Sequence, residues 1–322
     1  MKESAYRILT LLPSDATGTL TAVRRRRPVE PLGQHQIPPQ VVQTAVVLEE
    51  LRLVYVPVPK AGSTTILWVL AEVAGLAGED FADSRKLEVT RELTVHDMSV
   101  WGRSRLLQSR SPKEIESILV SDEWFRFSAV REPVRRLWSA WVSKVLLRDP
   151  RFVSAFGNED WFPRQTSSWT DIVASFRGFV RVLPTRPASW HDPHWSAQVD
   201  LIGLGNVDYA HIGRVERLEE TFAILRDCLA SRGISLPPVE HANRSLLPFA
   251  PGLLDRATLD ACNLWVARDR AGFGYLPLPA EDALDQRWCE TVDRTIPAIE
   301  AIADRNDRIG DIRRELEISL AS

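Results

Sequence analysis

The chain has 322 residues, of which 44% are hydrophobic and 26% are charged, and its formal net charge is −3. This length and apolar content suffice for one large α/β domain or two small ones. The charge balance excludes a globally basic nucleic-acid binder, so we expect no nucleic acid among the partners. The local basic run Arg24 to Arg27 is interpreted as part of a solvated tail, with a polyanion-binding arm as the alternative.

Membrane and redox signals in the sequence are weak. No run reaches the roughly 18 uninterrupted apolar residues that a membrane span needs, and the first residues lack the cleavage site of a signal peptide. The cysteines are odd in number and widely spaced, which indicates neither a disulfide framework nor a zinc site. They are Cys228, Cys262 and Cys289. We therefore expect a cytoplasmic protein without a membrane span or a bound metal.

The first third of the chain contains one clear change from strand to helix. Residues 1–45 are rich in Pro, Arg and Gln and predict a loosely ordered extension with a short helix near residues 6–12. Residues 51–58 form a short apolar run that is typical of a buried strand. Helix-forming residues follow at 63–76, with glycines close to the expected helix end.

Two more strand–helix units follow this first one. The run at 123–131 predicts a strand and residues 132–147 predict a helix, with Pro133 in its first turn. Residues 207–216 predict a third strand and 218–232 its helix. Repeated strand–helix units imply an α/β fold with a parallel sheet and helices on its faces. In such sheets ligands bind outside the carboxyl ends of the strands.

The rest of the chain is less regular or helical. Residues 150–200 are dense in Trp, Phe, Pro and Ser, which predicts loops mixed with short helices. From residue 280 onward the sequence predicts helix. We therefore expect a main domain at residues 46–278 and a C-terminal helical segment at 279–322. Its apolar stripe predicts packing against the chain's own domain, and a homodimer through paired C-terminal helices is the alternative. The stripe consists of Ile299, Ile302, Ile309, Ile312 and Leu316.

The stretch "PKAGSTT" lies where the first strand gives way to its helix. The first amides of a helix lack intrahelical partners, and the helix dipole adds positive potential there. Lys60 supplies a full charge, Gly62 allows close backbone approach, and residues 63–65 supply hydroxyls. This composition predicts a site for a phosphate-like anion. The lysine precedes the glycine, which does not fit the loop of nucleoside triphosphatases.

A second basic stretch, "VREPVRRLWSAW", starts at the end of the next strand. Arg131 ends that strand, and Ser139 lies two turns into the following helix, on the face shared by Arg135 and Arg136. An arginine fork with a hydroxyl makes a good second phosphate clamp. For Arg135 and Arg136 a simple surface charge is the alternative.

Together these stretches resemble the two donor motifs of sulfotransferases that use 3'-phosphoadenosine 5'-phosphosulfate (PAPS). The resemblance is to the carbohydrate sulfotransferases that include the chondroitin 4-O and HNK-1 enzymes. It spans roughly residues 50–277 and includes the segments "DPHWSAQVDLI", "DYAHIGRVERLEE" and "LWVARDRAGFGY" in the family's order. The resemblance implies a three-layer, P-loop-like sulfotransferase fold with a central parallel sheet and a C-terminal helix.

The resemblance also implies the chemistry and its residues. It predicts a PAPS-dependent enzyme that transfers a sulfuryl group to a glycan or small-molecule acceptor without a metal, releasing 3'-phosphoadenosine 5'-phosphate (PAP). The predicted donor site comprises Lys60, Ala61, Gly62, Ser63, Thr64, Thr65, Arg131, Ser139 and, in a polar loop, Arg244. The family's secretory members have a membrane anchor and cysteines after the His-Trp segment. Neither appears here, so we expect a cytoplasmic, bacterial relative, and the acceptor of the eukaryotic members is not carried over.

Two histidines are candidates for the base that accepts the acceptor's proton. His96 lies between the two donor motifs, where related glycan sulfotransferases place their catalytic residue, and a histidine is well tuned for this role. His194 is the competing candidate and, with Trp195, is predicted to bind the acceptor, although such tryptophans can equally be core residues. Glu216 is interpreted as a residue that orients the site or forms an ordinary salt bridge.

Two other classes of function remain as alternatives. A nucleotide-dependent phosphotransferase would need a Walker loop and carboxylates for Mg²⁺, and neither occurs at the required positions. A non-catalytic module that binds a 3',5'-nucleotide or a sulfated glycan would not need Lys60, His96 and Arg131 together.

Overall fold

The structure is a computed structural model that describes residues 37–76, 91–186, 192–239, 245–279 and 283–321. Among these residues, a four-stranded sheet has the order β1-β2-β3-β4. Its strands are β1 (Val46–Leu48), β2 (Leu53–Val56), β3 (Phe125–Val130) and β4 (His211–Arg214). β2, β3 and β4 are parallel, while β1 runs antiparallel to β2. The predicted parallel sheet is confirmed, and the antiparallel edge strand was not predicted because it has only three residues.

The described α-helices lie before, between and after the strands along the chain. They are α1 (Pro39–Thr44), α2 (Ser63–Val73), α4 (Pro112–Val120), α5 (Pro133–Trp141), α6 (Pro150–Phe156), α7 (Trp169–Val182), α8 (Gln198–Leu201), α9 (Leu218–Ala230), α10 (Arg256–Phe273) and α11 (Gln286–Ala321). The three strand–helix units therefore lie where the apolar runs and turn signals predict them. The predicted helix at residues 6–12 lies outside the described residues.

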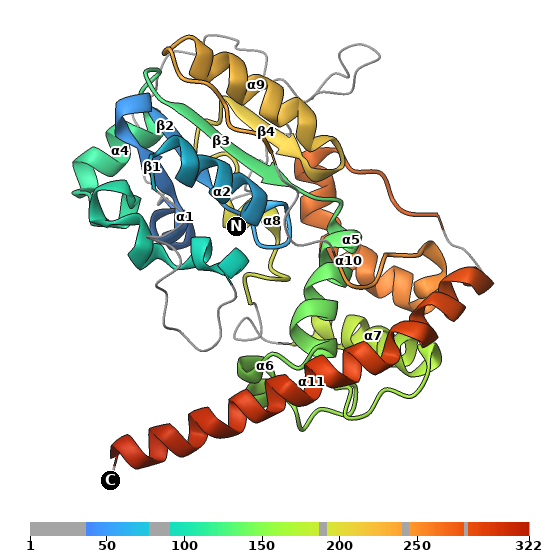
Figure 1. Cartoon of the computed structure of the whole chain (residues 1–322). Coiled ribbons are helices and arrows are strands. Elements are labelled where there is room, and N and C mark those ends of the chain that lie inside the picture. The colour runs from blue at the N-terminus through green and yellow to red at the C-terminus, as the bar shows by residue number, and fades with distance from the viewer. Residues whose placement is uncertain (1–36, 77–90, 187–191, 240–244, 280–282, 322) are drawn as a thin grey trace, which may run out of the picture.

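The sheet is the middle layer of three. One face packs against α2 and α9 through a core that includes Tyr55 and Phe127. The other face, which carries Val54, Val56 and Val130, packs against α1, α4 and α8. β2 is buried on both faces, as expected for a strand with helices on either side. This arrangement confirms the three-layer α/β fold (Figure 1).

α1 falls within the stretch expected to be loosely ordered. Its Val41 is fully buried and packs against the sheet face that also contacts α4. Residues 37–44 include two prolines and are too few to show a helical periodicity, so the sequence does not predict this short helix. The part of the chain that packs on the domain therefore begins several residues before position 46.

A second, all-helical core lies beside the sheet and is built from α5, α6, α7, α10 and α11 (Figure 1). α7 has 14 residues, so it is longer than the short helices expected in this region. Beyond Trp141, α5 continues as a π-helical segment, η6 (Val142–Leu146). Because α5 starts at the end of β3, it connects the sheet to the helical core.

The C-terminal helix α11 has two parts that differ in burial. Val292 and Ile299 are fully buried in the helical core, which confirms packing of this part against the chain's own domain. Further along, the helix projects beyond the rest of the molecule (Figure 1). Ile312, Leu316 and Ile318 are 37%, 49% and 71% exposed. Pairing of two such helices in a homodimer remains a prediction.

Candidate active site

The candidate site begins in the loop after β2, at the carboxyl end of the parallel strands. Lys60 adopts a left-handed backbone conformation with φ of 66°, which is uncommon for a residue other than glycine. Gly62, with φ of 72°, is the N-cap of α2. Ser63, Thr64 and Thr65 form the buried first turn of that helix. The predicted loop of Lys60 to Thr65 therefore meets a helix N-terminus, where anions bind favourably.

Arg131 leaves β3 beside this loop and contacts it directly. Its Nη1 donates a hydrogen bond of 3.3 Å to the main-chain oxygen of Lys60, although 71 residues separate the two. The backbone of Arg131 is held by the side chain of Gln198, which accepts from its N–H at 3.0 Å and donates to its oxygen at 2.9 Å. The structure thus brings the two predicted donor motifs together.

Gln198 belongs to a buried network that was not predicted. Its side chain is fully buried, and its Nε2 also donates to Asp269 Oδ2 at 3.1 Å. The other oxygen of Asp269 accepts from the main-chain N–H of Val199 at 3.0 Å. Asp269 in α10 therefore fixes the start of α8, and Gln198 fixes the end of β3.

His96 reaches the loop from the short helical segment η2 (Arg91–His96). Its Nε2 lies 2.8 Å from Thr64 Oγ1. The residue keeps a solvent-exposed surface. Desolvation of the remainder of the ring, followed by the positive charge of Lys60, lowers the pKa of His96 to about 4. His96 is therefore neutral at pH 7, the form that can accept a proton.

Lys60 sits among other cations. Burial, together with the charges of Lys144, Arg131 and Arg136, lowers the pKa of the Lys60 ammonium to about 7. This concentration of positive charge makes the site suited to a ligand with several negative charges.

His194 is oriented by a carboxylate. Its Nδ1 lies 2.5 Å from Asp192 Oδ1, and Asp192 also accepts from the main-chain N–H of His194 at 2.8 Å. Burial lowers the pKa of His194 to about 4, although hydrogen bonding to Asp192 opposes the shift and the charges of Lys144 and Lys60 add to it. Electrostatic interactions thus link both histidines to the same two lysines.

Arg136 plays a different part from the predicted phosphate clamp. Its side chain is buried, its Nε donates to Pro59 O at 2.9 Å, and its two terminal nitrogens donate to Ser196 O and Pro193 O at 2.8 and 2.6 Å. It therefore fastens the segment before α8 to the loop that carries Lys60. Arg135 is exposed, with its guanidinium 5.2 Å from the ring centre of Phe249.

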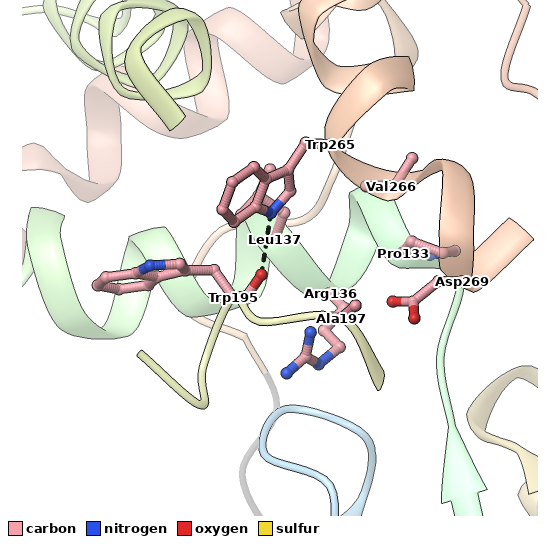
Figure 2. Close-up of a pocket in the computed structure, with 8 residues that line it drawn as sticks. All are labelled: Pro133, Arg136, Leu137, Trp195, Ala197, Trp265, Val266 and Asp269. Atoms are coloured by element: carbon pink, nitrogen blue, oxygen red, sulfur yellow. Dashed lines mark hydrogen bonds between the residues drawn. The ribbon is translucent and has the colours of Figure 1, made fainter. Parts of the chain in front are cut away.

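Trp195 is a core residue, which corrects the prediction that its ring contacts an acceptor. It is 1% exposed and packs against Phe152 and Phe179. Figure 2 shows a crevice between α5, α10 and residues 195–197, in which Trp265 Nε1 donates to Trp195 O at 2.9 Å. Arg136 lines this crevice, whereas Lys60 and Arg131 do not.

The remaining predicted site residues fall in three places. Ser139 is buried on α5, and its helix starts at the residue after Glu132, which follows Arg131. Arg244 lies outside the described residues. Glu216 accepts from the main-chain N–H of Glu132 at 2.8 Å and from the Tyr275 hydroxyl at 3.0 Å. It therefore orients the turn after Arg131, as one of its two interpretations predicts.

The described residues contain no cluster of three or more His, Cys, Asp or Glu side chains that could hold a metal ion. Among the same residues, no helix has both the length and the apolar character needed to cross a membrane. Cys228, Cys262 and Cys289 are free thiols.

Comparisons with known proteins give one consistent family. The model of the sulfotransferase family matches residues 43–245. Carbohydrate sulfotransferase 10 of Xenopus laevis is 27% identical over 258 residues, which cover 74% of this chain and 67% of that protein. The human and chicken proteins of the same name are 28% and 27% identical over 219 residues, or 62% of this chain. The chain thus spans little more than half of their length, 56%. No solved structure matches significantly. With its family model covering more than half of the chain, this protein belongs to the sulfotransferase family.

Proposed function

We propose that this sulfotransferase moves a sulfuryl group in line from PAPS to a hydroxyl of a glycan, glycolipid or glycosylated small molecule. The family supports sulfuryl transfer, and the names of its relatives, carbohydrate sulfotransferases, support a carbohydrate acceptor. The predicted cytoplasmic location and bacterial source remain predictions, and the relatives named above are animal proteins.

The observation that carries the proposal is the contact between Arg131 and the loop of Lys60. The guanidinium of Arg131 donates a hydrogen bond to Lys60 O, in the loop that leads into the N-terminus of α2. A nucleotide with phosphate groups at both its 3' and 5' positions can engage both groups at once, because each is suited to one anion.

The charges of the site fit such a donor. PAPS supplies a sulfuryl group on a 5'-phosphate leaving group, together with a separate 3'-phosphate. The charged groups that shift the pKa of Lys60 are all cations, so an anionic ligand would relieve their mutual repulsion. Arg131 and Ser139 would hold the 3'-phosphate, and the loop of Lys60, Ala61, Gly62 and Ser63 would hold the 5' end.

We assign Lys60 the role of stabilising the negative charge that develops on the leaving phosphate oxygen. Donors aimed at such a charge contribute a factor of about 10²–10³ in rate each. The main-chain amides at the start of α2 act on the same charge. The left-handed conformation of Lys60 turns the chain sharply between β2 and α2.

His96 is assigned as the base because its hydrogen bond to Thr64 places it at the loop that would hold the sulfuryl end. If Nε2–H donates to the Thr64 hydroxyl oxygen, Nδ1 keeps a free electron pair that can accept the proton of the acceptor hydroxyl. In His194 the two ring nitrogens exchange these roles: if Nδ1–H donates to Asp192, Nε2 keeps the electron pair that can accept a proton. We assign His194 to the acceptor side.

The test is transfer of radioactive sulfate from labelled PAPS to a panel of neutral and acidic oligosaccharides and glycosides. We expect label in at least one acceptor, and loss of that label in Lys60→Ala with the fold intact. Arg135→Ala is the matched control, because that arginine is exposed and its guanidinium lies over the ring of Phe249. If the protein binds PAPS, PAPS stays intact and no acceptor in the panel becomes labelled, the proposal is contradicted.

A further inference from the structure

Lys144 is a half-buried lysine that follows the helix carrying Ser139. It lies in η6, the π-helical continuation of α5. π-helical turns are rare, and those within helices occur frequently at functional sites. The wider turn changes which residues face the site, so the α-helical spacing from Ser139 does not predict where Lys144 points. Only five lysines occur in the chain, and Lys144 and Lys60 are two of them.

Phe152 in α6 links Lys144 to the acceptor-side histidine. The Lys144 ammonium lies 5.8 Å from the ring centre of Phe152, and the His194 ring meets the same phenyl ring edge-on at 5.8 Å. Asp149 holds the ammonium through an ion pair of 2.8 Å. Lys144 and His194 therefore contact the same phenyl ring. Arg136 binds Pro193 O, next to His194, and Pro59 O, next to Lys60, and so ties this region to the Lys60 loop.

The electrostatics of the site agree with this placement. The positive charge of Lys144 lowers the pKa of Lys60, His96 and His194 alike, which agrees with a position near this cluster of three residues. Among the described residues, Asp149 binds Lys144 and Arg151, and Asp192 binds His194.

The cations around Lys60 differ in their free donor capacity. The guanidinium of Arg136 gives hydrogen bonds to three main-chain carbonyls. The guanidinium of Arg131 has donors left after its bond to Lys60 O, and these are assigned above to the 3'-phosphate. An ammonium has three N–H donors, and Asp149 takes one of those of Lys144. Lys144 therefore has both the charge and the donors to bind a further anionic group.

We propose that Lys144 is a second catalytic lysine, which binds the oxygens of the sulfuryl group during transfer while Lys60 binds the leaving phosphate. This inference rests on the function proposed above. The acceptor oxygen forms a bond to sulfur as the bond from sulfur to the phosphate oxygen breaks. The electron pair of that bond stays on the phosphate, and the acceptor's proton passes to His96. Lys144 keeps its own protons throughout and stabilises the charge on the three sulfuryl oxygens.

The test compares binding of PAPS and of PAP, which lacks the sulfuryl group, by calorimetry without an acceptor. We expect Lys144→Met to weaken PAPS about 10- to 100-fold more than it weakens PAP, the usual loss for a hydrogen bond to a charged group. Lys144→Arg, which keeps the charge, should recover part of the preference. Lys113→Ala, an exposed lysine on α4, is the matched control and should change neither affinity.

A purely structural role of Lys144 gives a different pattern. Asp149→Asn removes the charge that holds Lys144 and keeps an acceptor oxygen. If Lys144 only anchors Asp149, both variants should lower the thermal midpoint and weaken PAP and PAPS equally, which would overturn the proposal. A histidine NMR titration is a second readout, because loss of the Lys144 charge should raise the pKa of His194. If the wild type does not bind PAP at all, the proposed function fails rather than the role of Lys144.

Discussion

Thr64 Oγ1 and His96 Nε2 lie 2.8 Å apart across 32 residues of sequence. This hydrogen bond joins the loop at the start of α2 to the segment between the two donor motifs. It therefore places a neutral imidazole at the end of the loop that would receive the sulfuryl group. The relationship gives His96 a position from which a base could act.

Replacing His96 tests this position. We expect His96→Ala to lower kcat by about 10²–10⁴, the usual contribution of general-base catalysis, because the acceptor hydroxyl loses its proton acceptor. The dissociation constant for PAP should remain within a few-fold of the wild-type value. Steady-state kinetics and calorimetry on the same preparation separate the two effects. A larger loss of kcat in His194→Ala than in His96→Ala would transfer the role of base to His194.

The lowered pKa of Lys60 predicts that donor binding depends on pH. With a pKa of about 7 in the free protein, Lys60 is charged below pH 7 and loses its proton as the pH rises through 7. A bound polyanion favours the charged form, so binding at higher pH must be accompanied by proton uptake. PAP affinity should therefore fall by up to about tenfold per pH unit between pH 7 and 9, where its phosphates are already ionised.

Calorimetry in buffers of different ionisation enthalpy measures this proton uptake directly. Lys60→Arg is the control, because a guanidinium keeps its charge throughout this range. We expect its PAP affinity to be nearly independent of pH. Equal pH dependence in the wild type and Lys60→Arg would show that another group is responsible.

Adjacent arginines on α5 should differ sharply in their effect on stability. Arg136→Ala leaves the oxygens of Pro59, Pro193 and Ser196 without their donor, so we expect the free energy of unfolding to fall by about 2–4 kcal/mol. Arg136→Lys should not restore it, since an ammonium cannot reproduce the planar fork. Arg135→Ala removes only an exposed contact with Phe249 and should cost less than about 1 kcal/mol. Urea unfolding curves give both values.

Gln198 should matter for the geometry of the donor site as well as for stability. Gln198→Ala leaves the backbone groups of Arg131 without buried partners, at about 1–3 kcal/mol for each group left unsatisfied. We expect weaker PAP binding as well, because Arg131 loses its fixed backbone. Unchanged unfolding and unchanged PAP affinity would show that the network around Gln198 is not needed to position Arg131.

The fold was largely predictable from the sequence because its main signals are local. The apolar runs that became β2 and β3 end at Pro57 and Arg131, and a helix-forming segment follows each. The short strand β1 and helix α1 carry no comparable signal, since their formation depends on packing against the sheet. The loop of Lys60 to Thr65 and Arg131 were predictable because strand ends in a parallel sheet meet at one edge.

The parts of the site that escaped prediction depend on long-range contacts. The charge of Arg136 indicated a phosphate ligand or a surface residue, whereas its buried position assigns its donors to main-chain oxygens. Trp195 faces a core formed by residues distant in sequence. The position of Lys144 depends on a π-helical turn, which the α-helical periodicity does not reveal. The scarcity of lysine in the chain is the one sequence signal that could have drawn attention to it.

The central claim is that the Lys60 loop and Arg131 together bind a nucleotide with phosphates at both its 3' and 5' positions. Calorimetric titration of the full chain with PAP tests it most directly, with ATP as the competing ligand and with Mg²⁺ present or absent. We predict micromolar binding of PAP that does not require Mg²⁺ and that is lost in Arg131→Ala but kept in Arg135→Ala. Tight binding of ATP without affinity for PAP would contradict the account and indicate a phosphotransferase.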